Sequence, residues 1–214
     1  MNAASIPPPR MHWGLLLAAA ATLMITMGAR QTTGLFVAPI HQDTGIGIAA
    51  ISFALAIGQF TWGAVQPVFG AIADKRGSTG VLVLGAVLLA LGLALTPHLT
   101  SAWGLMFTLG MLTAAGAGAG SFSILIGATA QRLAPEQRSF AAGFINAGGS
   151  LGQFVFAPLV QAVIAFAGWA SAMYTLAVAS LLAIPLALPL RRTTTPVPAS
   201  HAATAIGDIT LKQQ

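Results

Sequence analysis

The stretch GAIADKRGSTG, residues 70–80, sets a short charged turn between two long apolar runs. Residues 46–73 precede the charges and residues 79–97 follow them, and neither run contains an Asp, Glu, Lys or Arg. A membrane-spanning helix needs about 20 mainly apolar residues, and each run is about that long or longer. The sequence therefore predicts two spanning helices joined by a tight polar turn at residues 74–78.

The same alternation of apolar runs and polar breaks continues along the chain. Hydrophobic residues make up 56% of the sequence and charged residues only 6%, a composition typical of membrane proteins. Spanning helices are predicted at residues 13–40, 46–73, 79–97, 102–130, 139–167 and 169–190. The predicted fold class is an all-α membrane protein with six transmembrane helices in residues 13–190, an N-terminal segment at 1–12 and a linker or tail at 191–214. A cleaved leader is the alternative for the first run, but that run continues through residues 35–40 and five more spans follow.

The distribution of Lys and Arg predicts how the bundle is oriented. With six spans, both termini lie on the same side of the membrane as the second and fourth connections. That side carries Arg10, Lys75, Arg76, Arg132, Arg138, Arg191, Arg192 and Lys212. The connections on the other side carry no Lys or Arg, so the positive-inside rule predicts that both termini are cytoplasmic. We expect a multi-pass protein of a cell membrane, in a bacterium the inner membrane.

Several functional classes lack the residues that they need. The chain has no Cys, and its four His residues are far apart, so we predict no metal site and no cofactor. The cations are scattered singly or in pairs, which argues against a nucleic-acid partner. All acidic residues lie outside the predicted spans, at Asp43, Asp74, Glu136 and Asp208. A Ser, His and acid constellation at membrane depth is therefore excluded, and we do not expect an enzyme.

The charged turn resembles the loop signature of the major facilitator superfamily. The matching residues are Gly70, Ala73, Asp74, Lys75 and Gly77, whereas Ser78, Thr79 and Gly80 stand where that family usually has Arg or Lys. The connection APEQR at 134–138 and the glycine-rich GAGAGSF at 116–122 are also similar to family features. The stretch GMLTAAG at 110–116 lacks the Arg that the family's fourth helix normally carries. The first helix, GARQTTGLFVAPI at 28–40, most resembles the oxalate/formate antiporter and monocarboxylate transporter branches.

This resemblance covers nearly all of residues 12–192 and implies half of a transporter. The family's fold has two six-helix halves, each built from two inverted three-helix repeats, with substrate bound between the halves near the midplane. Six helices would supply one half, and a missing C-terminal half or a second copy of the chain would supply the other.

The resemblance also implies a gating role for the charged turn. In the family the corresponding Asp braces the cytoplasmic gate, and we expect Arg138 to be the partner of Asp74 in this chain. The expected gating residues are Gly70, Asp74, Lys75, Gly77 and Arg138. The alternative is a solvated loop that obeys the positive-inside rule and has no further role.

Arg30 is the one charged residue inside a predicted span. At 1.5 Å per residue it lies about 15 Å from Ile40 and about 26 Å from Trp13 along the helix axis. If the helix ended near residue 28, the guanidinium would only reach up to the membrane surface. We expect a longer helix, loosened around residues 32–34, because residues 13–28 are too few to span a bilayer. Arg30 would then face the central cavity and could grip a carboxylate through two hydrogen bonds.

Other polar side chains inside the predicted helices complete the expected substrate-binding set with Arg30. They are Gln59, Gln66, Asn146 and Gln153, and the plainer interpretation of each is a hydrogen bond between helices. Because no span contains an acid, the cavity is neutral or positive, which favours small organic anions such as mono- or dicarboxylates moved by alternating access. Two alternatives stay open: an exporter of neutral or cationic compounds, and a six-helix membrane scaffold without transport activity.

Overall fold

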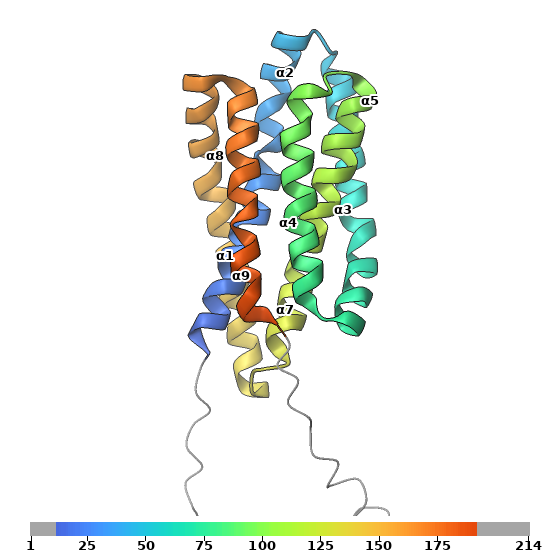
Figure 1. Ribbon diagram of the computed structural model, residues 1–214. Coiled ribbons are helices and arrows are strands. Elements are labelled where there is room, and N and C mark those ends of the chain that lie inside the picture. The colour runs from blue at the N-terminus through green and yellow to red at the C-terminus, as the bar shows by residue number, and fades with distance from the viewer. Residues whose placement is uncertain (1–11, 192–214) are drawn as a thin grey trace, which may run out of the picture.

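The computed structural model describes residues 12–191, and this part of the chain is helical without a β-strand. The predicted segment 1–12 and tail 191–214 therefore lie outside the described residues, apart from His12 and Arg191. Figure 1 shows the helices standing side by side as one bundle.

The helical elements follow the predicted runs closely. The first half contains α1 (Trp13–Gln31), η1 (Thr32–Phe36), α2 (Val37–Thr44), α3 (Ile48–Arg76), α4 (Ser78–Leu95) and η2 (Thr96–His98). The second half contains α5 (Ala102–Leu105), η3 (Met106–Thr113), α6 (Ala114–Ala119), α7 (Phe122–Ala130), α8 (Pro135–Leu181), α9 (Ala183–Ala187) and η4 (Leu188–Leu190).

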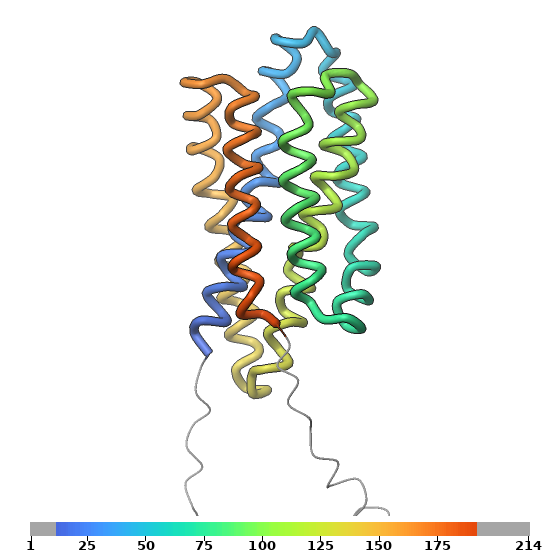
Figure 2. The backbone as a smooth tube through the Cα atoms, in the orientation of Figure 1, coloured from blue at the N-terminus to red at the C-terminus, as the bar shows by residue number. Residues whose placement is uncertain are grey.

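Five helical stretches among the described residues are long and apolar enough to cross a membrane. They are Trp13–Thr44, Ile48–Arg76, Ser78–His98, Ala102–Ala130 and Pro135–Leu190. The last stretch has 56 residues and is interrupted at Gly168, whose φ of 82° and ψ of 167° are not helical. Figures 1 and 2 show the chain rising through the first part of α8, turning back and descending to α9. The predicted break at 167–169 thus lies at a glycine, because residues with a side chain rarely adopt this conformation.

The first stretch confirms the longer form expected for the first helix. Helical structure continues from Trp13 to Thr44, and the segment η1 at Thr32–Phe36 is a 3₁₀-helix rather than an α-helix. The alternative of a helix that ends near residue 28 is therefore wrong. Gly45, with φ of 72°, ends the helix by a left-handed turn.

Charges are distributed unequally between the two ends of the bundle. Both ends of the described chain lie at the lower end in Figure 1, together with the α3–α4 turn and the α7–α8 connection. The described Lys and Arg residues of these regions are Lys75, Arg76, Arg132, Arg138 and Arg191. The second and fourth connections therefore lie at the same end of the bundle as both ends of the described chain, as the sequence predicts.

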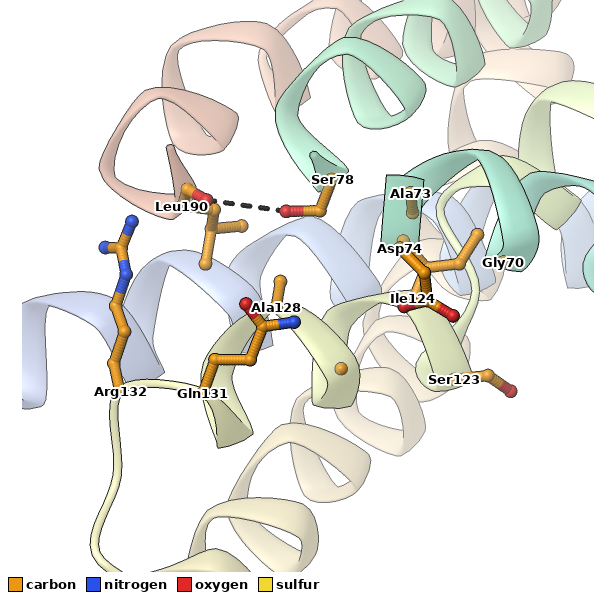
Figure 3. A pocket seen from close by; sticks show the side chains of 11 residues that line it. Gly70, Ala73, Asp74, Ser78, Ser123, Ile124, Ala128, Gln131, Arg132 and Leu190 are labelled. Carbon is orange, nitrogen blue, oxygen red and sulfur yellow. Dashed lines mark hydrogen bonds between the residues drawn. The ribbon is translucent and has the colours of Figure 1, made fainter. Parts of the chain in front are cut away.

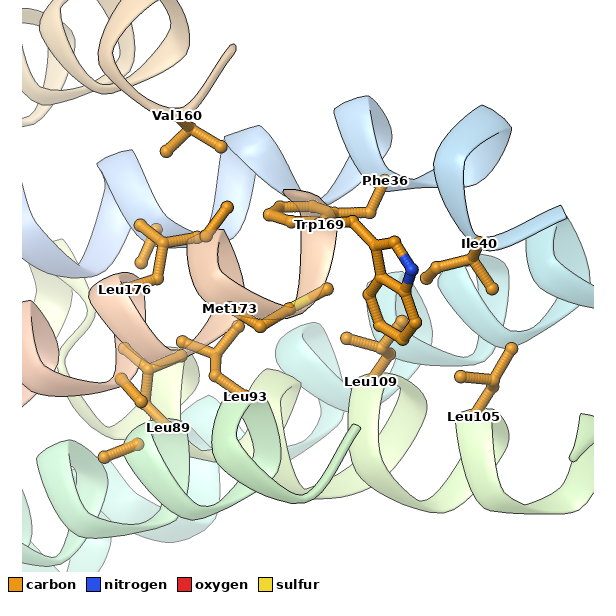
Figure 4. Packing of buried hydrophobic residues seen from close by; sticks show 14 of the residues in the cluster. Phe36, Ile40, Leu89, Leu93, Leu105, Leu109, Val160, Trp169, Met173 and Leu176 are labelled. Atoms are coloured by element: carbon orange, nitrogen blue, oxygen red, sulfur yellow. The ribbon is translucent and has the colours of Figure 1, made fainter. Parts of the chain in front are cut away.

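Two apolar clusters hold the helices together. One cluster includes Phe36, Ile40, Leu93, Leu105, Trp169 and Met173, which pack together from η1, α2, α4, α5 and α8 (Figure 4). The second includes Leu16, Leu23, Leu82, Leu125 and Ile145. The indole Nε1 of Trp169 also donates a hydrogen bond to Asp43 Oδ2 at 3.0 Å, which ties the Gly168 turn to the end of α2.

The outer surface is apolar as well, and of the five long apolar stretches α3 is the least buried. Its buried residues are only Ile51, Ala54, Gly58 and Ala73. Large side chains such as Phe60, Phe154 and Phe166 are 78–91% exposed. Such a surface can face lipid, because lipid tails are as apolar as these side chains. Helices in a membrane associate through close packing and not by removing apolar side chains from water.

Candidate functional site

The backbone around Arg30 is satisfied internally although its helix changes type there. Thr32 Oγ1 donates to the carbonyls of Gly28 at 3.1 Å and Ala29 at 3.0 Å, and Thr33 Oγ1 donates to Arg30 O at 2.7 Å. These hydroxyls add side-chain hydrogen bonds to carbonyls in the last turn of α1, where Gly28 O and Arg30 O also accept backbone N–H groups. In the sequence RQTT the α-helix thus passes into a 3₁₀-helix, and the two threonine hydroxyls bond to backbone carbonyls at this point.

The guanidinium of Arg30 is held by neutral groups. Its Nη1 donates to Gln31 Oε1 at 2.9 Å and its Nη2 donates to Gln59 Oε1. Its Cζ lies 4.2 Å from the centroid of the Trp62 ring, a cation–π contact. The carboxylates of the described chain, Asp43, Asp74 and Glu136, belong to the ends of α2, α3 and α8. The positive charge of Arg30 is thus oriented by its neighbours but not neutralised by them.

A second amide contact extends this cluster to a third helix. Gln31 accepts from Arg30 and its Nε2 donates to Gln153 Oε1 at 3.3 Å. The chain of side chains Gln59, Arg30, Gln31 and Gln153 therefore joins α3, α1 and the first part of α8. Gln31, Gln59 and Gln153 are exposed, and Arg30 is half-buried. The cluster lies on an open face of the described bundle.

A small cavity opens beside Arg30 between α1, α3 and η3. Its volume is about 200 Å³, and its lining includes Arg30, Gln59, Gly58, Leu109 and Thr113. This volume lies below the roughly 300–1,000 Å³ of pockets for drug-sized ligands, so the space suits a small ligand. Thr113 Oγ1, in the cavity wall, and the nearby Trp62 Nε1 are buried and have no hydrogen-bond partner among the described residues. The hydroxyl of Thr113 packs against Gly92 of α4, so the Arg30 guanidinium is the charged group that the cavity wall offers to a ligand.

Three of the five predicted binding residues come together, and two do not. Arg30, Gln59 and Gln153 belong to the cluster described above. Gln66, two helical turns from Gln59, instead lines a separate cavity near Asp74. Asn146 is exposed on α8, where its backbone carbonyl accepts from Ser150 Oγ at 3.3 Å.

Sequence reasoning missed three members of the site. Gln31 was a polar residue at membrane depth next to Arg30, and that depth was a sufficient signal. Trp62 follows Gln59 by three residues and so shares its helix face. Thr113 carries no signal of its own, because threonines in membrane helices usually bond to their own helix backbone.

The predicted gating turn is compact and depends on a glycine. Helix α3 ends at Arg76 and α4 begins at Ser78, so the reversal rests on Gly77 with φ of 92° and ψ of 148°. Its backbone N donates to Ala73 O at 2.9 Å, which closes the end of α3. Lys75 is exposed just before it. A side chain at residue 77 would strain this backbone, which is a physical reason for the glycine.

The cation that shares a cavity with Asp74 is Arg132 and not the expected Arg138. Arg138 Nε donates to Leu133 O at 3.4 Å, and no ion pair joins it to Asp74 within residues 12–191. Asp74 and Gly70 line a cavity of about 470 Å³ whose cationic side chain is Arg132 (Figure 3). The predicted Asp74–Arg138 pairing is therefore not formed, because Arg138 bonds within its own connection.

No group of three or more metal-binding side chains occurs in the part of the chain that the structure describes. His41 donates through Nδ1 to Ile46 O at 2.8 Å, and His98 is hydrogen-bonded through Nε2 to the Tyr174 hydroxyl at 3.0 Å. At the Arg30 cluster, a guanidinium without a carboxylate partner lies beside a small cavity, and such a group can donate charge-assisted hydrogen bonds to an anion.

Comparison with known proteins gives a family and several relatives. A profile of the Major Facilitator Superfamily matches residues 16–211. The oxalate:formate antiporter of Oxalobacter formigenes is 29% identical over 181 residues, 84% of this chain and 43% of that protein. Monocarboxylate transporter 13 of Rattus norvegicus is 28% identical over 180 residues, 81% of this chain and 41% of that protein. An uncharacterised 38 kDa protein of Thermoproteus tenax is 33% identical over 163 residues, 73% of this chain and 40% of that protein. The chain spans about two fifths of the length of these curated relatives.

Proposed function

The chain belongs to the Major Facilitator Superfamily, and on this premise we propose that it forms the N-terminal half of a secondary transporter for small organic anions. The substrates are mono- or dicarboxylates, and the mechanism is alternating access. The observation that carries the proposal is the Arg30 guanidinium, which neutral groups hold at the edge of a cavity of about 200 Å³.

Electrostatics favour an anion at this position. A cation inside a bilayer is costly unless it faces a cavity or a partner, and the contacts of Arg30 are amide oxygens and an aromatic ring. A guanidinium has five N–H donors in a planar fork, so donors remain for both oxygens of a carboxylate. The relatives named as an oxalate:formate antiporter and a monocarboxylate transporter support carboxylates as the substrate class.

A second half completes the site in this proposal. The polar cluster lies on an open face of the described bundle, where Gln31, Gln59 and Gln153 are exposed. In this fold, substrate lies between two six-helix halves near the midplane. The second half is either further sequence of a longer protein or another copy of this chain, and both termini face the cytoplasm in either arrangement.

Transport measurements test the proposal directly. The protein together with its second half, supplied as further sequence or as a second copy of the chain, is reconstituted in liposomes loaded with oxalate, formate or lactate, and exchange of the same labelled anion is followed. We expect Arg30→Lys to lower exchange at least about tenfold, with expression little changed, because Lys keeps the charge but loses the two-pronged hydrogen bonding. Arg76→Gln is the matched control, since Arg76 is an exposed cation at the lower end of α3.

The outcomes separate the proposal from its alternatives. Wild-type kinetics in Arg30→Lys would remove this role of Arg30. Exchange of neutral or cationic compounds in place of anions would favour the exporter. Particle size in detergent gives the number of copies, and a two-copy particle without any exchange would favour the scaffold.

A further inference from the structure

Another cavity lies at the lower end of the bundle, apart from the Arg30 cluster. Its volume is about 440 Å³, and it is lined by His12, Gly14, Leu15, Arg132 and Pro189. These residues come from the start of α1, the connection between α7 and α8, and η4. Arg132 also borders the neighbouring cavity, where its guanidinium extends toward the chain end that carries Leu190 (Figure 3).

The guanidinium of Arg132 is only partly satisfied. Its Nη1 donates to Pro189 O at 2.6 Å, which links the α7–α8 connection to η4. Its Nη2 is buried and has no hydrogen-bond partner within residues 12–191. A buried charged donor without an acceptor is costly, so this nitrogen indicates a ligand that brings an oxygen acceptor.

The electrostatics of the cavity favour an anion. Among residues 12–191, its lining includes Arg132 and His12 but no Asp or Glu. Arg191 follows Pro189 by two residues at the same end of the chain. The carboxylate of Asp74 lines the neighbouring cavity, so it lies on the other side of Arg132.

Aromatic side chains indicate the depth of this cavity in the membrane. Trp13, between two lining residues, is 51% exposed. Its ring centroid lies 6.1 Å from Phe140 and 5.9 Å from Phe144, both in edge-on contacts. Exposed tryptophans at helix ends lie at the level of the lipid headgroups. Leu15 and Pro189 add apolar wall next to the cationic group.

We infer that this cavity binds a phosphate-type anion through Arg132, and that the phosphate of an anionic membrane lipid is the occupant. An arginine can hold a phosphate through two parallel N–H···O bonds, and the free Nη2 provides a donor for this purpose. Basic pockets between transmembrane helices on the cytoplasmic side suit such headgroups. A bound lipid would join the start of α1 to η4 and so brace the lower end of the bundle.

The test measures lipid binding rather than transport. Native mass spectrometry counts the lipids that the purified full chain retains, and thermal unfolding is followed with phosphatidylglycerol, phosphatidylcholine or inorganic phosphate added. We expect phosphatidylglycerol to be retained and to raise the melting temperature more than phosphatidylcholine does. Arg132→Gln should lower the affinity for phosphatidylglycerol about tenfold or more, the effect of losing one charged hydrogen-bonding partner.

Two further variants keep the result interpretable. Arg76→Gln removes the same charge at the same end but from a residue outside the cavity lining, and it should bind lipid like the wild type. Gly14→Leu keeps Arg132 and fills the cavity, since a Cβ at Gly14 meets no atom within 4 Å. We expect Gly14→Leu to retain less phosphatidylglycerol than the wild type. If Arg132→Gln does not fold, lipid retention by Gly14→Leu alone tests the inference.

Each result assigns or removes the site. Selective protection by phosphatidylglycerol that both cavity variants abolish supports the lipid headgroup. Equal protection by inorganic phosphate, also abolished by Arg132→Gln, keeps the anion site but overturns the lipid as its occupant. Equal retention of phosphatidylglycerol by Arg132→Gln, Gly14→Leu and Arg76→Gln overturns the inference.

Discussion

At the scale of single residues, the neutral surroundings of Arg30 set its chemistry. Two amide oxygens and an indole ring orient the guanidinium, but none of them carries a negative charge. A carboxylate in the same place would orient the group equally well and would also neutralise it. Glutamine at position 59 on α3 therefore holds Arg30 without neutralising its charge.

Changing that glutamine to an acid tests this argument. Gln59→Glu places a carboxylate where Arg30 Nη2 already donates, so we expect an ion pair that repels an incoming anion. Anion exchange in liposomes should fall by more than about tenfold, because like charges brought together cost several kcal/mol. Gln66→Glu is the matched control, since Gln66 lies on the same helix but outside the Arg30 cavity. Equal kinetics in the two variants would contradict the role of the Arg30–Gln59 contact.

At the scale of helices, close backbone approach holds α1 against α8. A Cβ added at Gly152 would overlap the backbone of Met24, and one added at Gly148 would lie 2.6 Å from Ala20 O. Small residues allow such approach, which is the main source of helix association in lipid. This contact also fixes the distance between Gln31 on α1 and Gln153 on α8, because Gln153 directly follows Gly152.

The packing role of Gly152 predicts a stability difference between two glycines of one helix. Gly152→Ala should lower the free energy of unfolding by about 1–3 kcal/mol, the usual cost of overpacking. Gly143→Ala should leave stability unchanged or raise it slightly, because nothing lies within 4 Å of a Cβ there and alanine favours helix. Thermal unfolding of the two variants in detergent measures the difference. A Gly152→Ala protein as stable as Gly143→Ala would rule out a tight α1–α8 contact.

At the scale of the whole molecule, the described cations other than Arg30 gather at one end of the bundle. They include Lys75 and Arg76 beside the α3–α4 turn and Arg132 and Arg138 in the α7–α8 connection. Cytoplasmic loops carry such an excess of Lys and Arg, so we expect this end to face the cytoplasm.

The absence of cysteine from the sequence makes this orientation easy to test. Thr100→Cys places a thiol in the exposed connection before α5, and Ser139→Cys places one near the start of α8. A membrane-impermeant thiol reagent should label the first variant in intact cells. The second should react only after the membrane is permeabilised. The reverse labelling pattern would mean that the bundle is inserted the other way round.

The helices and their ends were predictable because they depend on local features of the chain. Hydropathy over about 20 residues locates a span, and Gly45, Gly77 and Gly168 mark reversals through backbone angles that other residues avoid. The special position of Arg30 was equally visible, since a lone charge in an apolar run needs a cavity or partner. Even the loosening of the first helix was expected close to where the 3₁₀ segment Thr32–Phe36 occurs.

The sequence by itself thus determined the class of protein, the helical segments, the unequal charge of the two ends and the position of Arg30 as a charge within an apolar span. Only the tertiary structure decided which polar side chains meet: Gln31 joins Arg30 to Gln153, Gln66 and Asn146 stay outside, and Arg132 rather than Arg138 shares a cavity with Asp74. The reason is physical. Hydropathy and turn geometry act within one segment, whereas contacts between helices depend on how each helix is rotated and how closely its small residues let its neighbour approach.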